Sequence, residues 1–92
     1  MSYRVEVRRA AADELAKLPP GLRTGILGRI ASLAEDPRPA GSRALQEGAG
    51  AVRRLRTWDR RVAFTVDDQA GLVRVWMIGH RGTFYHRYRR RQ

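Results

Sequence analysis

The hydrophobic pattern of this 92-residue chain changes from period two to the helical period and back again, which constrains its fold more than any other feature. A period of two is typical of strands with one buried face, and a period near 3.6 is typical of amphipathic helices. Residues 2–8 alternate, with Tyr3, Val5 and Val7 on one face. The pattern therefore predicts a strand, then helices over residues 9–36, then further strands over residues 51–78.

Two helices are expected between Arg9 and Asp36. Pro19, Pro20 and Gly21 end the first helix, and Pro20 can occupy the first position of the second. Asp36 ends the second helix, because the residue before a proline avoids helical backbone angles. The apolar positions at helical spacing are Ala11, Leu15 and Leu18 in the first helix, and Leu22, Ile26, Ile30, Leu33 and Ala34 in the second. Together they predict a helical hairpin.

The second half of the chain is expected to form a sheet. The expected segments are a loop over 37–50, strands over 51–57, 61–67 and 72–78, a turn at Asp59, a hairpin turn over 67–71, and a strand end at Gly79. Residues 72–78 are apolar on both faces except at Arg74, which favours a central strand. The order β-α-α-β-β-β predicts an α+β fold in a single domain over residues 1–92. In this fold the N-terminal strand and helical hairpin pack on a small, mainly antiparallel C-terminal sheet. The helices cover one face of the sheet, and arginines occupy the other face.

Charge indicates a polyanionic partner. The chain has 19 basic and 9 acidic residues, a net charge of +10, and residues 51–92 carry +8 of it. Such a field attracts nucleic acid or a very acidic protein. The absence of cysteine excludes disulfides and thiolate metal sites. We expect no metal, no small-molecule cofactor and no membrane partner, and the absence of a visible export signal predicts a cytoplasmic protein.

The candidate chemistry is metal-free RNA cleavage. Arg54 and Arg56 share one face of a strand, Arg61 begins the next, and His80 follows the last. RNA supplies its own nucleophile, the 2′-hydroxyl, so a protein needs only to move two protons and to stabilise charge on phosphorus. The alternative interpretation is a solvated face of arginines, with Trp58 and Trp76 serving in packing. In that interpretation the terminal arginines Arg87, Arg89, Arg90 and Arg91 are a solvated charge run.

The ordered set of segments resembles the RelE/ParE superfamily of bacterial toxins over nearly the whole chain. The segments that carry the resemblance are YRVEV, AADELAKLP, LAEDP, RALQEG, RLRTWDRRVAFTVDD and VWMIGHRGTFYHR. The spacing from Arg56 to Arg61 matches the family pattern. The resemblance implies a toxin of a type II toxin–antitoxin module with a small sheet and an N-terminal helical hairpin. RelE-like members are ribosome-dependent endoribonucleases that cut messenger RNA and arrest translation, and an acidic, RelB-like antitoxin silences them.

Site roles follow from that resemblance. Arg61 matches the arginine that stabilises the transition-state phosphate. Arg81 matches an arginine assigned to phosphate binding or to protonation of the leaving group, and Tyr85 matches a tyrosine proposed as base or stacking group. His80 is the other candidate for proton transfer. The arginines expected to contact RNA are Arg53, Arg54, Arg56, Arg60 and Arg87.

Three departures from the family pattern keep the function open. Val52 and Arg54 stand where some members have lysines, one of which is a candidate base. Arg60 replaces a common aromatic residue, and Trp58 stands at a common glycine position. Either Tyr85 or His80 must then take the proton, or cleavage is slow, or the target differs. The alternatives are a ParE-like gyrase poison without nuclease activity and an inactive member that only binds antitoxin.

Overall fold

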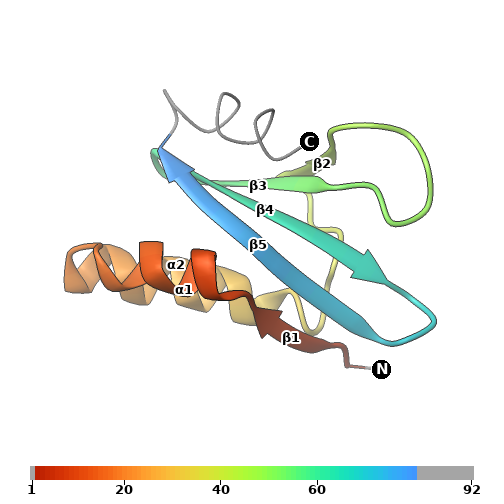
Figure 1. Cartoon of the computed structure of the whole chain (residues 1–92), viewed down its shortest axis with the longest axis horizontal. Helices are drawn as coiled ribbons and strands as arrows, with labels where there is room; N and C mark the ends of the chain where they lie inside the picture. Colours follow the sequence, from red (N-terminus) through yellow and green to blue (C-terminus); the bar gives the residue numbers. More distant parts are fainter. Residues whose placement is uncertain (1, 81–92) are drawn as a thin grey trace.

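A five-stranded sheet with two helices on one face forms the body of the protein, in a computed structural model that describes residues 2–80 (Figure 1). The elements are β1 (Arg4–Val7), α1 (Arg9–Ala16), α2 (Pro20–Ser32), β2 (Ser42–Ala44), β3 (Arg53–Thr57), β4 (Arg60–Asp67) and β5 (Leu72–His80). The strand order is β1-β5-β4-β3-β2. β1 pairs with β5 in parallel, and the other pairs are antiparallel. The predicted α+β class and the mainly antiparallel sheet are confirmed.

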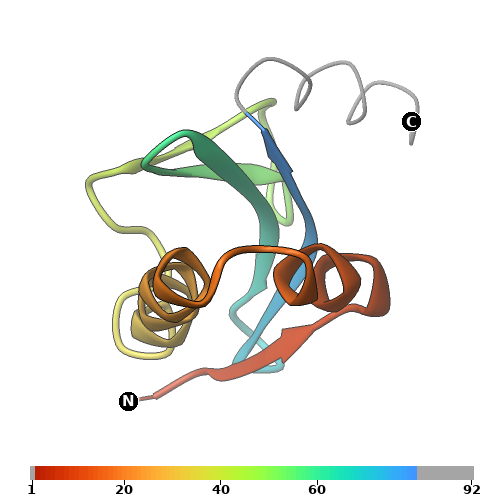
Figure 2. The ribbon, with the colours of Figure 1, turned by 90° about the vertical axis from the view of Figure 1, so that its left-hand side faces the viewer.

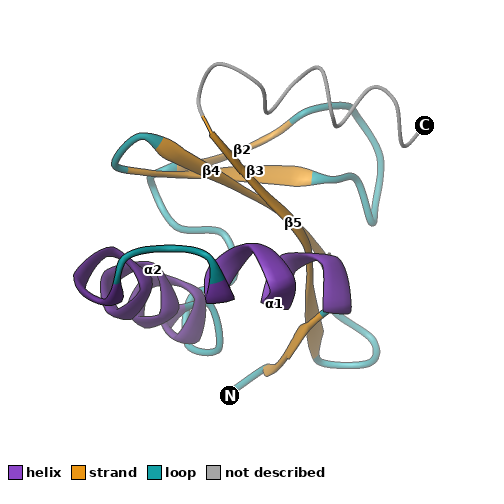
Figure 3. Cartoon of the chain, turned by 60° about the vertical axis from the view of Figure 1, so that its left-hand side comes forward, coloured by secondary structure: helices purple, strands orange, loops and turns teal. Residues whose placement is uncertain are grey.

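The main core lies between the helices and the sheet. Figures 2 and 3 show both helices on the same face, side by side. The buried residues of this core are Ala11, Leu15, Leu18, Ile26, Ile30, Leu33, Leu55, Val62, Phe64, Val66, Val73, Val75 and Ile78. Tyr3, Val5 and Val7 pack against it, so the predicted apolar faces of the first strand and of β4 are confirmed. The predicted central strand is β5, which has β1 on one side and β4 on the other.

The helix-free face of the sheet carries a smaller apolar cluster. Ala63 and Met77 are buried there, with Leu45 and Val52 packed against them. Strand alternation assigns Arg54, Arg56 and Arg61 to this face, because Leu55 and Val62 point into the main core. The predicted separation of an apolar face and an arginine-bearing face is therefore present in the sheet.

Three expected boundaries were wrong. The segment 37–50 is not entirely loop, because Ser42–Ala44 pairs with β3 as the edge strand β2. This strand is held by backbone hydrogen bonds, so it has no hydrophobic pattern in the sequence. Gly79 does not end the last strand, since it pairs with Arg61, and His80 pairs with Arg60. α2 ends at Ser32 instead of Asp36, because the following amides bond three residues back: Leu33 donates to the carbonyl of Ile30.

A β-bulge in β5 changes which residues share a face. Ala63 pairs with Met77 and Phe64 with Val75, so Trp76 is the extra residue between them. The indole Nε1 of Trp76 donates to the Oγ1 of Thr65 at 2.9 Å, across the helix-free face. Beyond the bulge Gly79, and not His80, lies beside Arg61.

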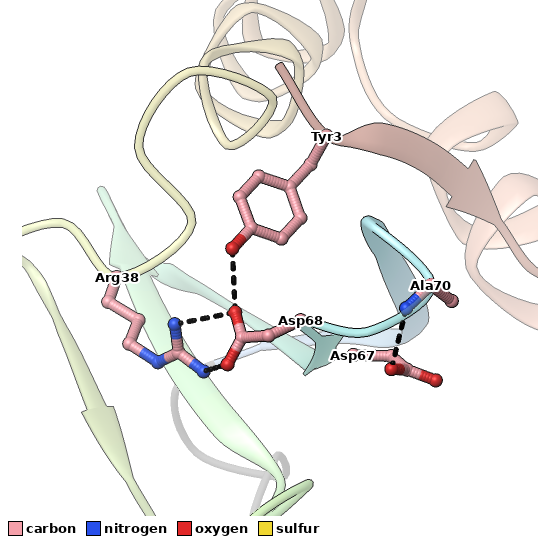
Figure 4. A network of polar contacts seen from close by, with 5 residues as sticks. All are labelled: Tyr3, Arg38, Asp67, Asp68 and Ala70. Carbon is pink, nitrogen blue, oxygen red and sulfur yellow. Dashed lines mark hydrogen bonds and ion pairs between the residues drawn. The ribbon is translucent and has the colours of Figure 1, made fainter. Parts of the chain in front are cut away.

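A polar cluster joins three segments at the far end of β4 (Figure 4). The Tyr3 hydroxyl donates to Oδ1 of Asp68 at 2.6 Å, and the Arg38 guanidinium donates to both oxygens of that carboxylate, at 3.2 and 2.9 Å. These hydrogen bonds, first that of Arg38 and then that of Tyr3, lower the pKa of Asp68. The hydrogen bond to Asp68 raises the pKa of Tyr3. The cluster ties the start of β1 and the segment after α2 to the β4–β5 turn.

We expect this cluster to stabilise the fold only while Asp68 is ionised. A carboxyl group with a lowered pKa contributes stability above its unfolded pKa, and that contribution is lost as the pH falls through the folded value. Asp68→Asn should therefore lower the thermal unfolding midpoint near neutral pH, and the difference from wild type should vanish in strong acid. Tyr3→Phe should lose only part of the same contribution. An unchanged midpoint for Asp68→Asn at neutral pH contradicts the role.

Candidate functional site

Two arginines stand side by side on the helix-free face at the closed end of the β3–β4 hairpin. Arg56 is directly opposite Arg61 in the register. Arg56 turns its amide away from β4, donating to the carbonyl of Gly41 at 3.3 Å, so this is a non-hydrogen-bonded pair. Side chains lie closest together at such pairs, and like charges directly opposite are destabilising. The pair therefore favours an anion between or above the two guanidinium groups.

Burial distinguishes the arginines of this face. Arg56 is exposed, whereas Arg61 retains 7% and Arg54 8% of its accessible surface. The alternative of a wholly solvated arginine face is therefore wrong for these two side chains. Nη1 of Arg61 donates to the carbonyl oxygens of Arg60 at 3.2 Å and Trp58 at 3.4 Å. These bonds orient the guanidinium before any ligand arrives, and Gly79 places no side chain beside it.

The turn that fixes this arrangement has an unusual residue. Thr57 and Arg60 close a connection of two residues, and Trp58 adopts a φ of 57°. Positive φ at the first position of a two-residue hairpin loop normally selects glycine, because a side chain there is strained. The Trp58 side chain is 63% exposed, but its ring reaches α2 and lies against Gly25. The tryptophan thus connects the hairpin to the helices.

A second group lies at the same end of the sheet, on the face that carries the helices. Asp59 in the turn forms ion pairs with Nη1 of Arg60 at 2.7 Å and with Nε2 of His80 at 3.5 Å. Arg60 and His80 are opposite each other across β4 and β5. The sequence marks Asp59 only as a turn residue. Its contacts with Arg60 and His80 leave no separate signal in the sequence, because they depend on the strand register.

Arg53 lies apart from the other candidates. It shares the helix side of β3 with Leu55, and its Nη2 donates to the Oγ of Ser42 at 3.0 Å. Burial, and then the positive charge of Arg38, lower the pKa of Arg53. A ligand on the helix-free face would not reach it directly.

The structure therefore separates the predicted site residues into groups. Arg54, Arg56 and Arg61 share the helix-free face, Arg60 and His80 meet at Asp59, and Arg53 lies elsewhere on β3. Arg81, Tyr85 and Arg87 fall outside the described residues. Within residues 2–80 no cluster of three or more His, Asp or Glu side chains could hold a metal ion. No helix in that range is long and apolar enough to cross a membrane.

Solved structures with the same architecture are RelE toxins, alone or bound to RelB. The RelE–RelB complex of Pyrococcus horikoshii matches with a TM-score of 0.82 at 23% identity, over 89% of this chain and 98% of that one. The RelBE2 toxin–antitoxin complex of Mycobacterium tuberculosis matches with 0.75 at 24%, over 88% and 93%. The isolated Escherichia coli RelE toxin matches with 0.70 at 22%, over 98% of both chains. The chain therefore has the RelE-like toxin fold.

Sequence comparisons gave no such match. No protein-family model and no curated protein matches this chain. The likeness therefore rests on three-dimensional architecture at identities below one quarter.

The contact between Trp58 and Gly25 predicts coupling between two substitutions. A Cβ added at Gly25 would lie 2.7 Å from Cη2 of Trp58, so Gly25→Ala must displace the ring. Alanine in a helix interior is favoured over glycine by about 1 kcal/mol. We expect Gly25→Ala to gain that full amount only in a Trp58→Gly background and to gain less in the wild type. Denaturant unfolding of the four proteins in this cycle measures the coupling, and strictly additive free energies would contradict the contact.

Proposed function

We propose that this protein is the toxin of a type II toxin–antitoxin system and cleaves messenger RNA on the ribosome without a metal ion. The RelE-like fold supports the general assignment, since neighbours with this fold were solved as RelE toxins. The proposal places its action in the cytoplasm, where translating ribosomes are found. The assignment of metal-free messenger RNA cleavage depends on the chemistry of Arg56 and Arg61.

The single observation that carries the proposal is the opposition of Arg56 and Arg61 on the helix-free face. Two adjacent guanidinium groups repel each other, and a phosphodiester relieves that repulsion while accepting their hydrogen bonds. The exposed Arg56 is positioned to meet the phosphate first. Arg61, already held by two carbonyl groups, is suited to stabilise the charge that develops on phosphorus.

The proposed reaction is an internal transesterification of RNA. A base takes the proton of the 2′-hydroxyl, the 2′-oxygen forms a bond to phosphorus, and the bond from phosphorus to the 5′-oxygen breaks. An acid protonates that leaving oxygen, which yields a 2′,3′-cyclic phosphate and a new 5′-hydroxyl. In the proposal Tyr85 serves as the base and Arg81 aids the leaving group. His80 is the second candidate base, but it pairs with Asp59 on the face that carries the helices, so it must reach the phosphate around the end of the sheet. Arg54, Arg60 and Arg87 provide further contacts to RNA.

A second candidate, a gyrase poison without nuclease activity, is favoured by one observation. The two positions at which some RelE-like nucleases have lysines are occupied by Val52, packed on the small apolar cluster, and by the buried Arg54. Neither is suited to accept a proton, because valine has no titratable group and arginine stays protonated. Cleavage then depends wholly on Tyr85 or His80.

The proposed partners are an acidic antitoxin, the ribosome and messenger RNA. Several of the neighbouring structures with this fold are complexes of a RelE toxin with a RelB antitoxin. A net charge of +10 gives this chain strong attraction for an acidic protein and for RNA phosphates. Competition between these two polyanions for one cationic surface would silence the toxin.

Substitution of Arg61 tests the proposal most directly. In a translating extract, the wild-type protein should generate new messenger ends that require ribosomes and carry 2′,3′-cyclic phosphates. Arg61→Ala should slow cleavage by roughly 10²–10³-fold, the loss typical of one preorganised transition-state donor. Arg61→Lys should recover part of the rate, because it restores the charge but not the planar fork. Arg56→Ala should weaken binding more than it slows the chemical step.

The control is Arg9→Ala, which removes the same charge from an exposed position on α1. It should leave cleavage unchanged, and every variant should retain the wild-type unfolding midpoint to within a few degrees. Undiminished cutting by folded Arg61→Ala would overturn the site. Intact messenger together with inhibited DNA supercoiling would favour the gyrase poison, and normal translation and supercoiling would favour a member that only binds antitoxin.

A further inference from the structure

One part of β4 has a strand on only one side. β4 covers Arg60–Asp67, but its pairing with β3 stops at Phe64, opposite Arg53. Its pairing with β5 continues through Thr65, Val66 and Asp67. Among the described residues, no strand lies along the other edge of this stretch. Such an edge is a template for an additional strand.

The backbone of Val66 faces this open side. Along β3, Arg56 donates its amide to Gly41, and Val52 accepts at its carbonyl from Leu45, so even-numbered residues face away from β4. Arg53, Leu55 and Thr57 consequently exchange hydrogen bonds with β4, at Phe64, Val62 and Arg60. The same alternation, continued by one step along β4, makes the amide and carbonyl of Val66 point away from β5. They face the strip beside residues 65–67 that β3 does not occupy, which is called the lane below.

Open space adjoins that lane. A cavity of about 660 Å³ is lined by Thr65–Asp68, by Arg74 and Trp76 of β5, and by Arg38, Ala49 and Gly50 from the segments before β3. A smaller hollow of about 70 Å³ adjoins it and shares Arg38, Ala49, Gly50 and Val66, and Arg53 lines it. Val66 is the only β4 residue that lines both hollows. The two hollows thus meet at the residue whose backbone groups face outward.

The charges around the lane favour a carboxylate at one end. Asp68 is engaged by Arg38 and Tyr3, Asp67 accepts from the amide of Ala70, and Arg74 forms an ion pair with Glu6. Arg53 has no ion pair within residues 2–80, and its buried Nε has no acceptor. The lowered pKa of Arg53 has burial as its main cause and the nearby Arg38 as its second. A carboxylate would offset both effects.

We propose that an extended acidic peptide adds to the open edge of β4 as a short strand, with its backbone paired to Val66 and a carboxylate bound by Arg53. The occupant is identified by this chemistry: an extended backbone supplies a donor and an acceptor to Val66, and an acidic side chain meets Arg53. This surface is distinct from the arginine pair, because Arg53 and Arg56 point to opposite faces of β3. Peptide binding at this edge is separate from RNA cleavage and can be measured without RNA.

A synthetic peptide of alternating valine and glutamate, labelled for fluorescence anisotropy, tests the site with the full chain. We expect saturable binding, and we expect Arg53→Gln to weaken it by about tenfold or more, as for loss of a charge-assisted hydrogen bond. A peptide with glutamine in place of glutamate should lose a similar factor on the wild type and little more on Arg53→Gln. N-methylation of the central peptide amides should abolish binding, because pairing needs those donors.

The control is Arg43→Gln, which removes an equal charge from the exposed side of β2, opposite Arg54. It should change the affinity by less than about twofold. Hydrogen exchange gives a second measurement: the Val66 amide should become protected when the acidic peptide binds. Equal losses for Arg43→Gln and Arg53→Gln, or binding that leaves Val66 exchange unchanged, would reduce the interaction to general charge attraction and overturn the proposal. Absence of any saturable binding would overturn it as well.

Discussion

The register of the β3–β4 hairpin is the constraint on which the arrangement of the sheet depends. A connection of only two residues joins Thr57 to Arg60, so the pairing cannot slip without rebuilding the turn. A slip of one residue would move Val62 and Phe64 from the core to the helix-free face and would carry Arg61 into the core. The energy of burying those apolar side chains, about 1.5–3 kcal/mol each, therefore also holds Arg61 opposite Arg56.

This constraint is met at a local cost. Trp58 keeps a left-handed backbone that normally selects glycine, and the nearby Arg61 is almost completely buried. Strain and buried charge of this kind persist where the surrounding structure over-determines them, and they concentrate at functional sites. The packing of Trp58 on Gly25 and the two carbonyl groups that bind Arg61 are the compensating contacts. Both compensations arise within or beside the same turn.

Much of the fold could be predicted from the period of the hydrophobic residues and from the residues that break helices. The alternation of Val62, Phe64 and Val66, the helix break at Pro19 and the central position of residues 72–78 each follow from local pattern, because burial on one face imposes a period on the sequence. The edge strand Ser42–Ala44 could not be predicted in this way. It is held by backbone pairing with β3, and its three residues show no hydrophobic period in the sequence.

The candidate site was less predictable, because it depends on which face each side chain takes. Arg54, Arg56 and Arg61 were expected together, and alternation within each strand was sufficient to place them. His80 was expected near Arg61, but the bulge at Trp76 and the strand register place Gly79 there instead. A bulge adds one residue without interrupting the apolar run, so the sequence gives no sign of it. Arg53 is a different case, because alternation along β3 by itself places it on the face opposite to Arg54 and Arg56.

β3 connects the two proposed surfaces. Its even-numbered arginines face the helix-free side, and Arg53 faces the hollow beside β4. A strand added at Val66 would continue the lane of β3 and extend the pairing that fixes the hairpin, while leaving the Arg56–Arg61 pair uncovered. An occupant at this edge could therefore act on the arginine pair only through the position of β3 or through a further segment that crosses the sheet. Because both surfaces are cationic, charge attraction alone does not determine which of them a ligand binds. The face to which each β3 side chain points separates the two surfaces.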